Sequence, residues 1–117
     1  MHYFEFAEKD ATLYEATASM NTGLDEILEV RKDVSDTGTT VDVSRILIKF
    51  DLSYISSSVS SGLISNPKYY LNLFDAKPTA LATSQSLQAY PVSQSWTMGD
   101  GRSYDDPRTT EGCSWNF

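Results

Sequence analysis

Cysteine and histidine are nearly absent from this sequence, which has one of each among its 117 residues. Because Cys113 has no second cysteine to pair with, no internal disulfide forms and packing must supply the stability. His2 lies beside the terminus, where a Ser-His-Asp or Cys-His pair would rest on a fraying end. The sequence also has no His/Cys cluster for zinc and no glycine loop for a nucleotide phosphate. Together these absences predict a protein that is not an enzyme.

Positive charge and long apolar runs are scarce as well. Nine Lys and Arg stand against 16 Asp and Glu, giving a formal charge of -7, so a phosphate backbone would be repelled. No stretch approaches the roughly 20 apolar residues of a membrane helix, and residues 1–6 lack the basic start and apolar run of a signal peptide. We therefore expect a soluble product of the cytoplasm, including that of an infected host, with neither nucleic acid nor membrane as a partner.

What the chain does contain is enough apolar side-chain area for a core. Apolar residues make up 40% of the sequence and aromatic residues 12%, which is well above a disordered composition. Since domains commonly run to about 100–150 residues, residues 1–117 are expected to form a single domain.

Alternation of apolar and polar residues is clearest over residues 44–51. Ile46, Ile48 and Phe50 lie on one face of an extended chain there, and charged residues lie on the other, which predicts a central strand. Further strands are predicted at residues 3–6, 10–15, 68–74 and 86–92. In the last of these Pro91 cannot donate to a ladder, so it indicates a strand end or a sheet edge.

Two further segments do not follow simple strand alternation. Residues 24–34 fit both helical spacing and strand alternation, and we favour a strand. Residues 51–55 are expected to leave the sheet through a helical turn, and the serine-rich residues 56–61 are expected to form a solvated loop.

These assignments predict one antiparallel sandwich, because the connections are too short for parallel crossovers. Its core is predicted from the inward positions of the three clearest strands, with Tyr69 on the same face as the second of them. The expected core residues are Ile46, Ile48, Phe50, Leu71, Leu73 and Leu87.

Several segments of the chain, taken in order, resemble segments of a known protein family. Residues 44–52 read SRILIKFDL, residues 90–96 read YPVSQSW, residues 99–101 read GDG and residues 112–115 read GCSW. In this order they resemble the DNRLRE-type β-sandwich domains, which are related to a carbohydrate-binding module family. With KDATLYE at residues 9–15 and NTGLDEILE at residues 21–29, the pattern is similar to virion structural proteins of tailed phages, especially contractile-tailed ones.

The resemblance implies an all-β, antiparallel, jelly-roll-like β-sandwich in which residues 24–34 are extended. Family domains continue past the S-W strand. We therefore expect this chain to be the N-terminal portion of a longer domain, with a sandwich that is incomplete at its C-terminus.

Two ligand sites are candidates on chemical grounds. Asp100, Asp105 and Asp106 supply hard oxygen ligands in a glycine-containing loop and are candidates for calcium, against a solvated acidic turn as the plainer interpretation. Calcium is the only cofactor that the sequence suggests.

The second candidate site is aromatic. Flat rings cover the apolar side of a sugar, so a carbohydrate platform is the alternative to core packing for Trp96, Tyr104 and Trp115.

The chain also ends in a strand-like aromatic pattern. Ser114, Trp115, Asn116 and Phe117 are expected to form an open edge that another chain satisfies. From this edge and the resemblance we expect a structural protein of a phage virion, made in the host cytoplasm, that binds other virion proteins and copies of itself. The alternative function is a carbohydrate-binding module that attaches to a glycan surface.

Overall fold

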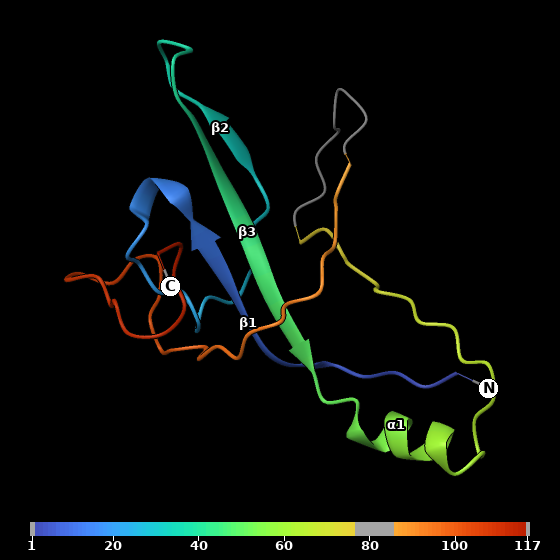
Figure 1. The fold of residues 1–117 in the computed structure, drawn as a ribbon. Coiled ribbons are helices and arrows are strands. Elements are labelled where there is room, and N and C mark those ends of the chain that lie inside the picture. Colours follow the sequence, from blue (N-terminus) through green and yellow to red (C-terminus); the bar gives the residue numbers. More distant parts are fainter. Residues whose placement is uncertain (1, 77–85, 117) are drawn as a thin grey trace.

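The computed structural model describes residues 2–76 and 86–116, which are built around one small antiparallel sheet (Figure 1). Along the chain come strand β1 (Ala7–Tyr14), a short 3₁₀ helix (Glu15–Thr17), strand β2 (Lys32–Val34), strand β3 (Val41–Phe50) and helix α1 (Ser53–Ser60). The strand order in the sheet is β1-β3-β2. Antiparallel strands with little helix confirm the all-β expectation, although the described residues form one sheet and not two.

Strand β3 is the centre of the sheet, as the alternation at residues 44–51 predicted. β1 pairs with its second half, from Tyr14↔Ser44 to Ala7↔Phe50, with an irregularity between Ala7 and Lys9. The three residues of β2 pair with its first three, from Lys32↔Val43 to Val34↔Val41. β3 therefore pairs with β1 on one side, along Ser44 to Phe50, and with β2 on the other side, along its first three residues.

The segment 24–34 is a strand only over its last three residues. Hydroxyl side chains bind the backbone just before β2: Glu29 N–H donates to Thr12 Oγ1 at 3.1 Å, and Arg31 N–H donates to Ser44 Oγ at 2.8 Å. Ser44 Oγ in turn donates to the carbonyl of Glu29 at 2.6 Å. A strand over the whole segment was thus wrong, because side chains take the backbone bonds that a ladder would have made.

Three further strand predictions, at residues 3–6, 68–74 and 86–92, are also wrong. These segments are irregular in the structure, and Leu71, Leu73 and Leu87 are 51%, 51% and 63% exposed, while Tyr69 is exposed too. Of the predicted core, Ile46, Ile48 and Phe50 are partly buried. Alternation shows which side chains share a face, but a strand also needs a neighbour to pair with, and these segments pair with no described strand.

The exit from β3 is helical, as expected, but it continues through the serines that were expected to form a loop. Asp51 Oδ1 accepts the Ser53 N–H at 3.0 Å ahead of the first turn, and hydrogen bonds from the Ser53 side chain and from this N–H lower the pKa of Asp51. α1 has eight residues, and none of the helices in the described ranges is both long and apolar enough to cross a bilayer.

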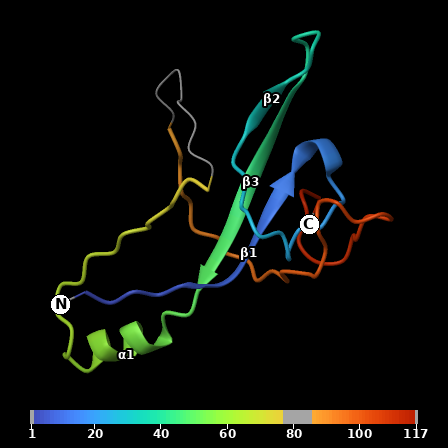
Figure 2. The ribbon, with the colours of Figure 1, turned by 180° about the vertical axis from the view of Figure 1, so that it is seen from behind.

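Both views of the ribbon show the same division of the molecule (Figures 1 and 2). Residues 98–116 gather beside the end of β1 and the 3₁₀ helix. Residues 61–76 run as an extended arm away from the sheet. The packed part of the chain is thus built from its beginning, its middle strand and its last fifth.

The centre of this packed part is the amide side chain of Asn21, which is fully buried. Its Nδ2 donates to the carbonyls of Met98 at 2.7 Å and Cys113 at 2.9 Å. Its Oδ1 accepts the N–H groups of Gly23 at 3.2 Å and Gly101 at 2.9 Å. Two donors and two acceptors are therefore all satisfied, and three segments are joined at one amide.

Glycines make this close approach possible. A Cβ on Gly99 would lie 2.4 Å from Asn21 Oδ1, and a Cβ on Gly112 would lie 2.6 Å from Asn21 Nδ2. Both glycines also have positive φ, at 80° and 101°, which other residues rarely adopt. Residues 21–23 and 99–101 thus belong to one buried structure.

Asn21→Ala should destabilise the fold by about 3 kcal/mol or more, because two buried carbonyls and two N–H groups lose their partner. Urea unfolding followed by tryptophan fluorescence would measure this change. Asn72→Ala, at an exposed position, is the matched control and should change stability by less than about 0.5 kcal/mol. Equal effects of the two substitutions would contradict the central role of Asn21.

Candidate functional site

Both tryptophans pack against cations of the sheet. Lys9 Nζ lies 4.4 Å from the centre of the Trp96 ring and also donates to the Trp96 carbonyl. The Arg45 guanidinium lies 4.8 Å from the centre of the Trp115 ring. In the register of the sheet, Lys9 and Arg45 share the face that carries Ala11, and Ala11 is fully buried. The two cation–π contacts therefore fasten the C-terminal segment over this face.

The three residues predicted as a sugar platform do not line one groove. Trp96 lines a groove of about 470 Å³ beside the end of β3. Tyr104 lines a separate groove of about 410 Å³ together with Tyr14, Asp25 and other residues. Trp115 lines neither of these grooves. One face of each tryptophan is already covered by a cation, so a shared flat platform does not form in this arrangement.

The acidic loop predicted for calcium is organised by hydrogen bonds of its own. Asp105 Oδ2 accepts the Arg102 N–H at 2.8 Å and the Thr109 hydroxyl at 3.1 Å. Asp100 and Asp106 are exposed. No group of three metal-ligating His, Cys, Asp or Glu side chains occurs within residues 2–76 and 86–116, so the structure does not bring the three aspartates together as ligands.

The C-terminal residues form a turn and not the expected open strand. Ser114 is buried, Trp115 stacks on Arg45, and Asn116 N–H donates to the Ala18 carbonyl at 3.1 Å. Phe117 lies outside the described residues. Residues 114–116 are thus not a strand, because they bind to Ala18 and Arg45 of the same chain.

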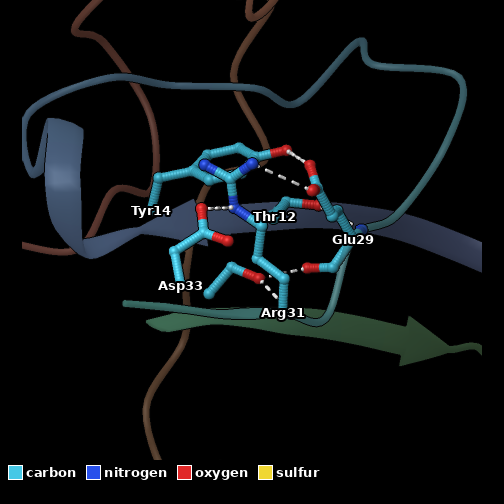
Figure 3. Close-up of polar contacts among 6 residues, drawn as sticks. Thr12, Tyr14, Glu29, Arg31 and Asp33 are labelled. Carbon is cyan, nitrogen blue, oxygen red and sulfur yellow. Dashed lines mark hydrogen bonds and ion pairs between the residues drawn. The ribbon is translucent and has the colours of Figure 1, made fainter. Parts of the chain in front are cut away.

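A polar cluster holds the segment before β2 against the sheet (Figure 3). The Tyr14 hydroxyl donates to Glu29 Oε2 at 2.8 Å. Arg31 forms ion pairs with Glu29 at 3.2 Å and Asp33 at 3.1 Å, and its guanidinium lies 5.6 Å from the centre of the Tyr14 ring. The Tyr14 phenol, the Arg31 guanidinium and the Glu29 carboxylate thus bind one another, and their contacts hold the segment before β2 against β1.

The environment of Tyr14 changes its acidity. Burial, the hydrogen bond to Glu29 and the charges of Glu29 and Asp25 together raise the pKa of Tyr14 to about 12, while Arg31 opposes them. In Cys113 burial likewise raises the pKa of the thiol. Both groups are therefore kept neutral, which suits structural roles.

The largest feature of the surface is apolar. Among the described residues the buried apolar side chains are only Ala11, Met20 and Cys113, and the largest fully buried side chains are polar. By contrast Phe4, Phe6 and Phe74 are 77%, 90% and 93% exposed. Other large apolar residues on the extended segments are also exposed: Tyr3, Leu63, Tyr69, Tyr70, Leu71, Leu73, Leu87, Tyr90 and Val92.

We call these twelve residues the apolar arms. They lie on the segments before β1, after α1 and before Trp96. Exposed apolar area is a mark of interaction sites, and these twelve residues make the arms the best candidate functional site in the described part of the chain.

Sequence reasoning missed the residues that organise the packed part. Asn21 and Lys9 appeared only within the segments that carry the family resemblance, and Arg45 only among the charged positions of the central strand. The available signal was the density of glycines near residues 99–112, because several glycines close together often mark a close backbone approach.

Comparisons of the chain with protein-family models, with curated proteins and with solved structures each return no match.

The raised pKa of Tyr14 predicts a tyrosine transition near pH 12. Below pH 10 the phenol is neutral in the folded and the unfolded state, so its contribution to stability is complete. As the pH rises from 10 to about 12, only the unfolded state releases the proton, and stability should fall. Ultraviolet titration of the wild type against Tyr14→Phe would reveal the late transition.

Glu29→Gln is the matched variant for this titration. It removes the carboxylate charge and weakens the hydrogen bond, so the Tyr14 midpoint should move down toward the ordinary value of about 10. An unchanged midpoint would mean that Glu29 does not act on Tyr14.

Proposed function

We propose that this chain is a non-enzymatic structural module that works by assembling with other polypeptide chains. The observation that carries the proposal is the accessible surface, which is 9680 Å² for a chain of 13.0 kDa. A compact monomer of that mass exposes about 6,300 Å². The radius of gyration is 17.1 Å, against about 13 Å for a compact domain of this length.

The surplus of about 3,300 Å² on this one chain exceeds the roughly 1,000–2,500 Å² that each partner of an obligate pair commonly buries, which is half of a total of about 2,000–5,000 Å². Much of it is the surface of the apolar arms. Burying such side chains contributes about 25 cal/mol per Å² of apolar area, so a partner that covers the arms gains a large driving force.

The resemblance to DNRLRE-type domains supports a proposal for the kind of particle in which the chain assembles. Such domains have two sheets, and residues 2–76 and 86–116 of this chain form one. We propose that strands from neighbouring chains complete a jelly-roll-like sandwich over the arms. The neighbours would be other virion proteins and copies of this chain, in the particle of a tailed phage whose host cytoplasm makes the protein.

The carbohydrate alternative has less support. It needs aromatic faces that are open to a sugar, and the two tryptophans each have a cation over the ring. Tyr104 is exposed but lines a different groove from Trp96. A glycan array would show micromolar binding if this alternative were correct.

Sedimentation equilibrium of the 117-residue chain across a dilution series tests the proposal. We expect dimers or larger species at micromolar concentration, because the exposed apolar area is too large for a stable monomer. A soluble monomer throughout the series would contradict the proposal.

A matched pair of variants locates the interaction. Replacing Phe4, Phe6 and Phe74 by Ser should weaken association at least about tenfold, since each large apolar side chain contributes roughly 1.5–3 kcal/mol on burial. Tyr104→Ser removes an equally exposed aromatic residue outside the arms and should leave association unchanged. The circular dichroism of all variants should match that of the wild type.

A further inference from the structure

Most strand edges of this sheet are protected by side chains. The free edge of β1 is covered at Thr12, where Thr22 Oγ1 accepts the Thr12 N–H at 3.2 Å and donates to the Thr12 carbonyl at 2.6 Å. Past the end of β1, Glu15 Oε2 accepts the Val43 N–H at 3.0 Å. β2 has only three residues, of which Lys32 and Asp33 are charged. Short, charged or capped edges resist pairing with another chain.

The second half of β3 is different. Thr12 directs both backbone groups away from β3, toward Thr22, and in an antiparallel pair the opposite residue then also points away. Its partner is Ile46, so Ile46 and, two residues further, Ile48 direct their N–H and C=O groups to the side where β2 would lie.

β2 does not reach that far. Its pairing stops at Val43, and one further bond joins Ser44 N–H to the Arg31 carbonyl at 3.0 Å. Within the described part of the chain, no residue bonds to the outward groups of Ile46 and Ile48. This length of β3 is an open edge with apolar side chains.

We propose that this edge pairs with the same edge of a second copy of the chain, with β3 running antiparallel to its counterpart and the two-fold axis at Ile48. The proposal rests on the assembly function above and names one of its contacts. Outward-pointing residues face each other in this register, so Ile48 exchanges two hydrogen bonds with its own equivalent. Ile46 lies opposite Phe50 of the other copy.

A second copy of the chain suits this edge because the side chains of the two β3 strands complement one another. With the axis at Ile48, Arg45, whose guanidinium also lies over the Trp115 ring, comes opposite Asp51 of the other copy, the residue that follows β3 and accepts the Ser53 N–H. Opposite charges that face each other across paired strands stabilise the pair. The apolar residues Ile46, Ile48 and Phe50 meet only one another. A groove of about 470 Å³ runs between this edge and residues 90–96, which leaves space beside Ile48 and Phe50.

Disulfide trapping tests the register. In the proposed dimer the two Ile48 Cα atoms are about 5.5 Å apart, a distance that suits a disulfide. In a Cys113→Ala background, Ile48→Cys should give a covalent dimer under mild oxidation. Val41→Cys is the control, because it lies on the same strand at a more exposed position but far from the axis, and it should stay monomeric on a non-reducing gel.

A second pair of variants does not depend on oxidation. Ile48→Pro removes the outward N–H without breaking a bond to β1, and it should weaken association at least about tenfold. Ile48→Val keeps the N–H and should associate like the wild type. Circular dichroism checks that the proline variant is folded.

The outcomes separate this inference from the assembly function. Trapping at residue 48 but not at residue 41, with weakened association of the proline variant, supports the edge contact. If the chain associates but Ile48→Cys is not trapped, or Val41→Cys is trapped equally, assembly stands and the β3 edge is overturned. If the chain is a monomer at all concentrations, both proposals fail.

Discussion

The amide of Asn21 is the interaction on which the packed part of this molecule depends. It binds the carbonyls of Met98 and Cys113 and the N–H groups of Gly23 and Gly101. Two backbone bonds, from the Asn21 N–H to the Thr109 carbonyl and from the Leu24 N–H to the Gly101 carbonyl, each at 2.9 Å, join the same segments beside it. The cation–π contacts of Lys9 and Arg45 then lie where this amide has already brought the two tryptophans.

A centre of this kind has an energetic consequence for the rest of the surface. The largest fully buried side chains are those of Asn21, Thr12, Thr22 and Ser114, and hydrogen bonds fix geometry more than they add net stability. Many large apolar side chains lie instead on extended segments in contact with water. The described part of the molecule therefore has a specific but small interior, to which these apolar side chains contribute little.

The sequence allowed the central strand, the first strand and the helical exit to be predicted, because each depends on local pattern. Alternation over residues 44–51 sufficed for β3, and Asp51 before a run of serines sufficed for the start of α1. The same kind of alternation over residues 68–74 did not produce a strand, since pairing requires a neighbour that alternation does not specify. For the candidate site, the sequence predicted Leu71, Leu73 and Leu87 in the core and not on the apolar arms, because burial depends on a neighbour that alternation does not specify. The partners of the tryptophans were not predicted either, because contacts such as Lys9–Trp96 span 87 positions.

The separation of Asn21 from its partners also sets an order of events in the cell. The bonds to Met98, Gly101 and Cys113 span 77, 80 and 92 positions. At the usual rate of about 5–20 residues per second, a ribosome needs roughly 5–18 s to add the last of them. Once residue 50 has been added, β1 and β3 can pair, yet the face around Ala11 has no cover and the buried amide lacks these partners. Until Cys113 emerges, contacts made by the nascent chain therefore compete directly with the bonds of Asn21.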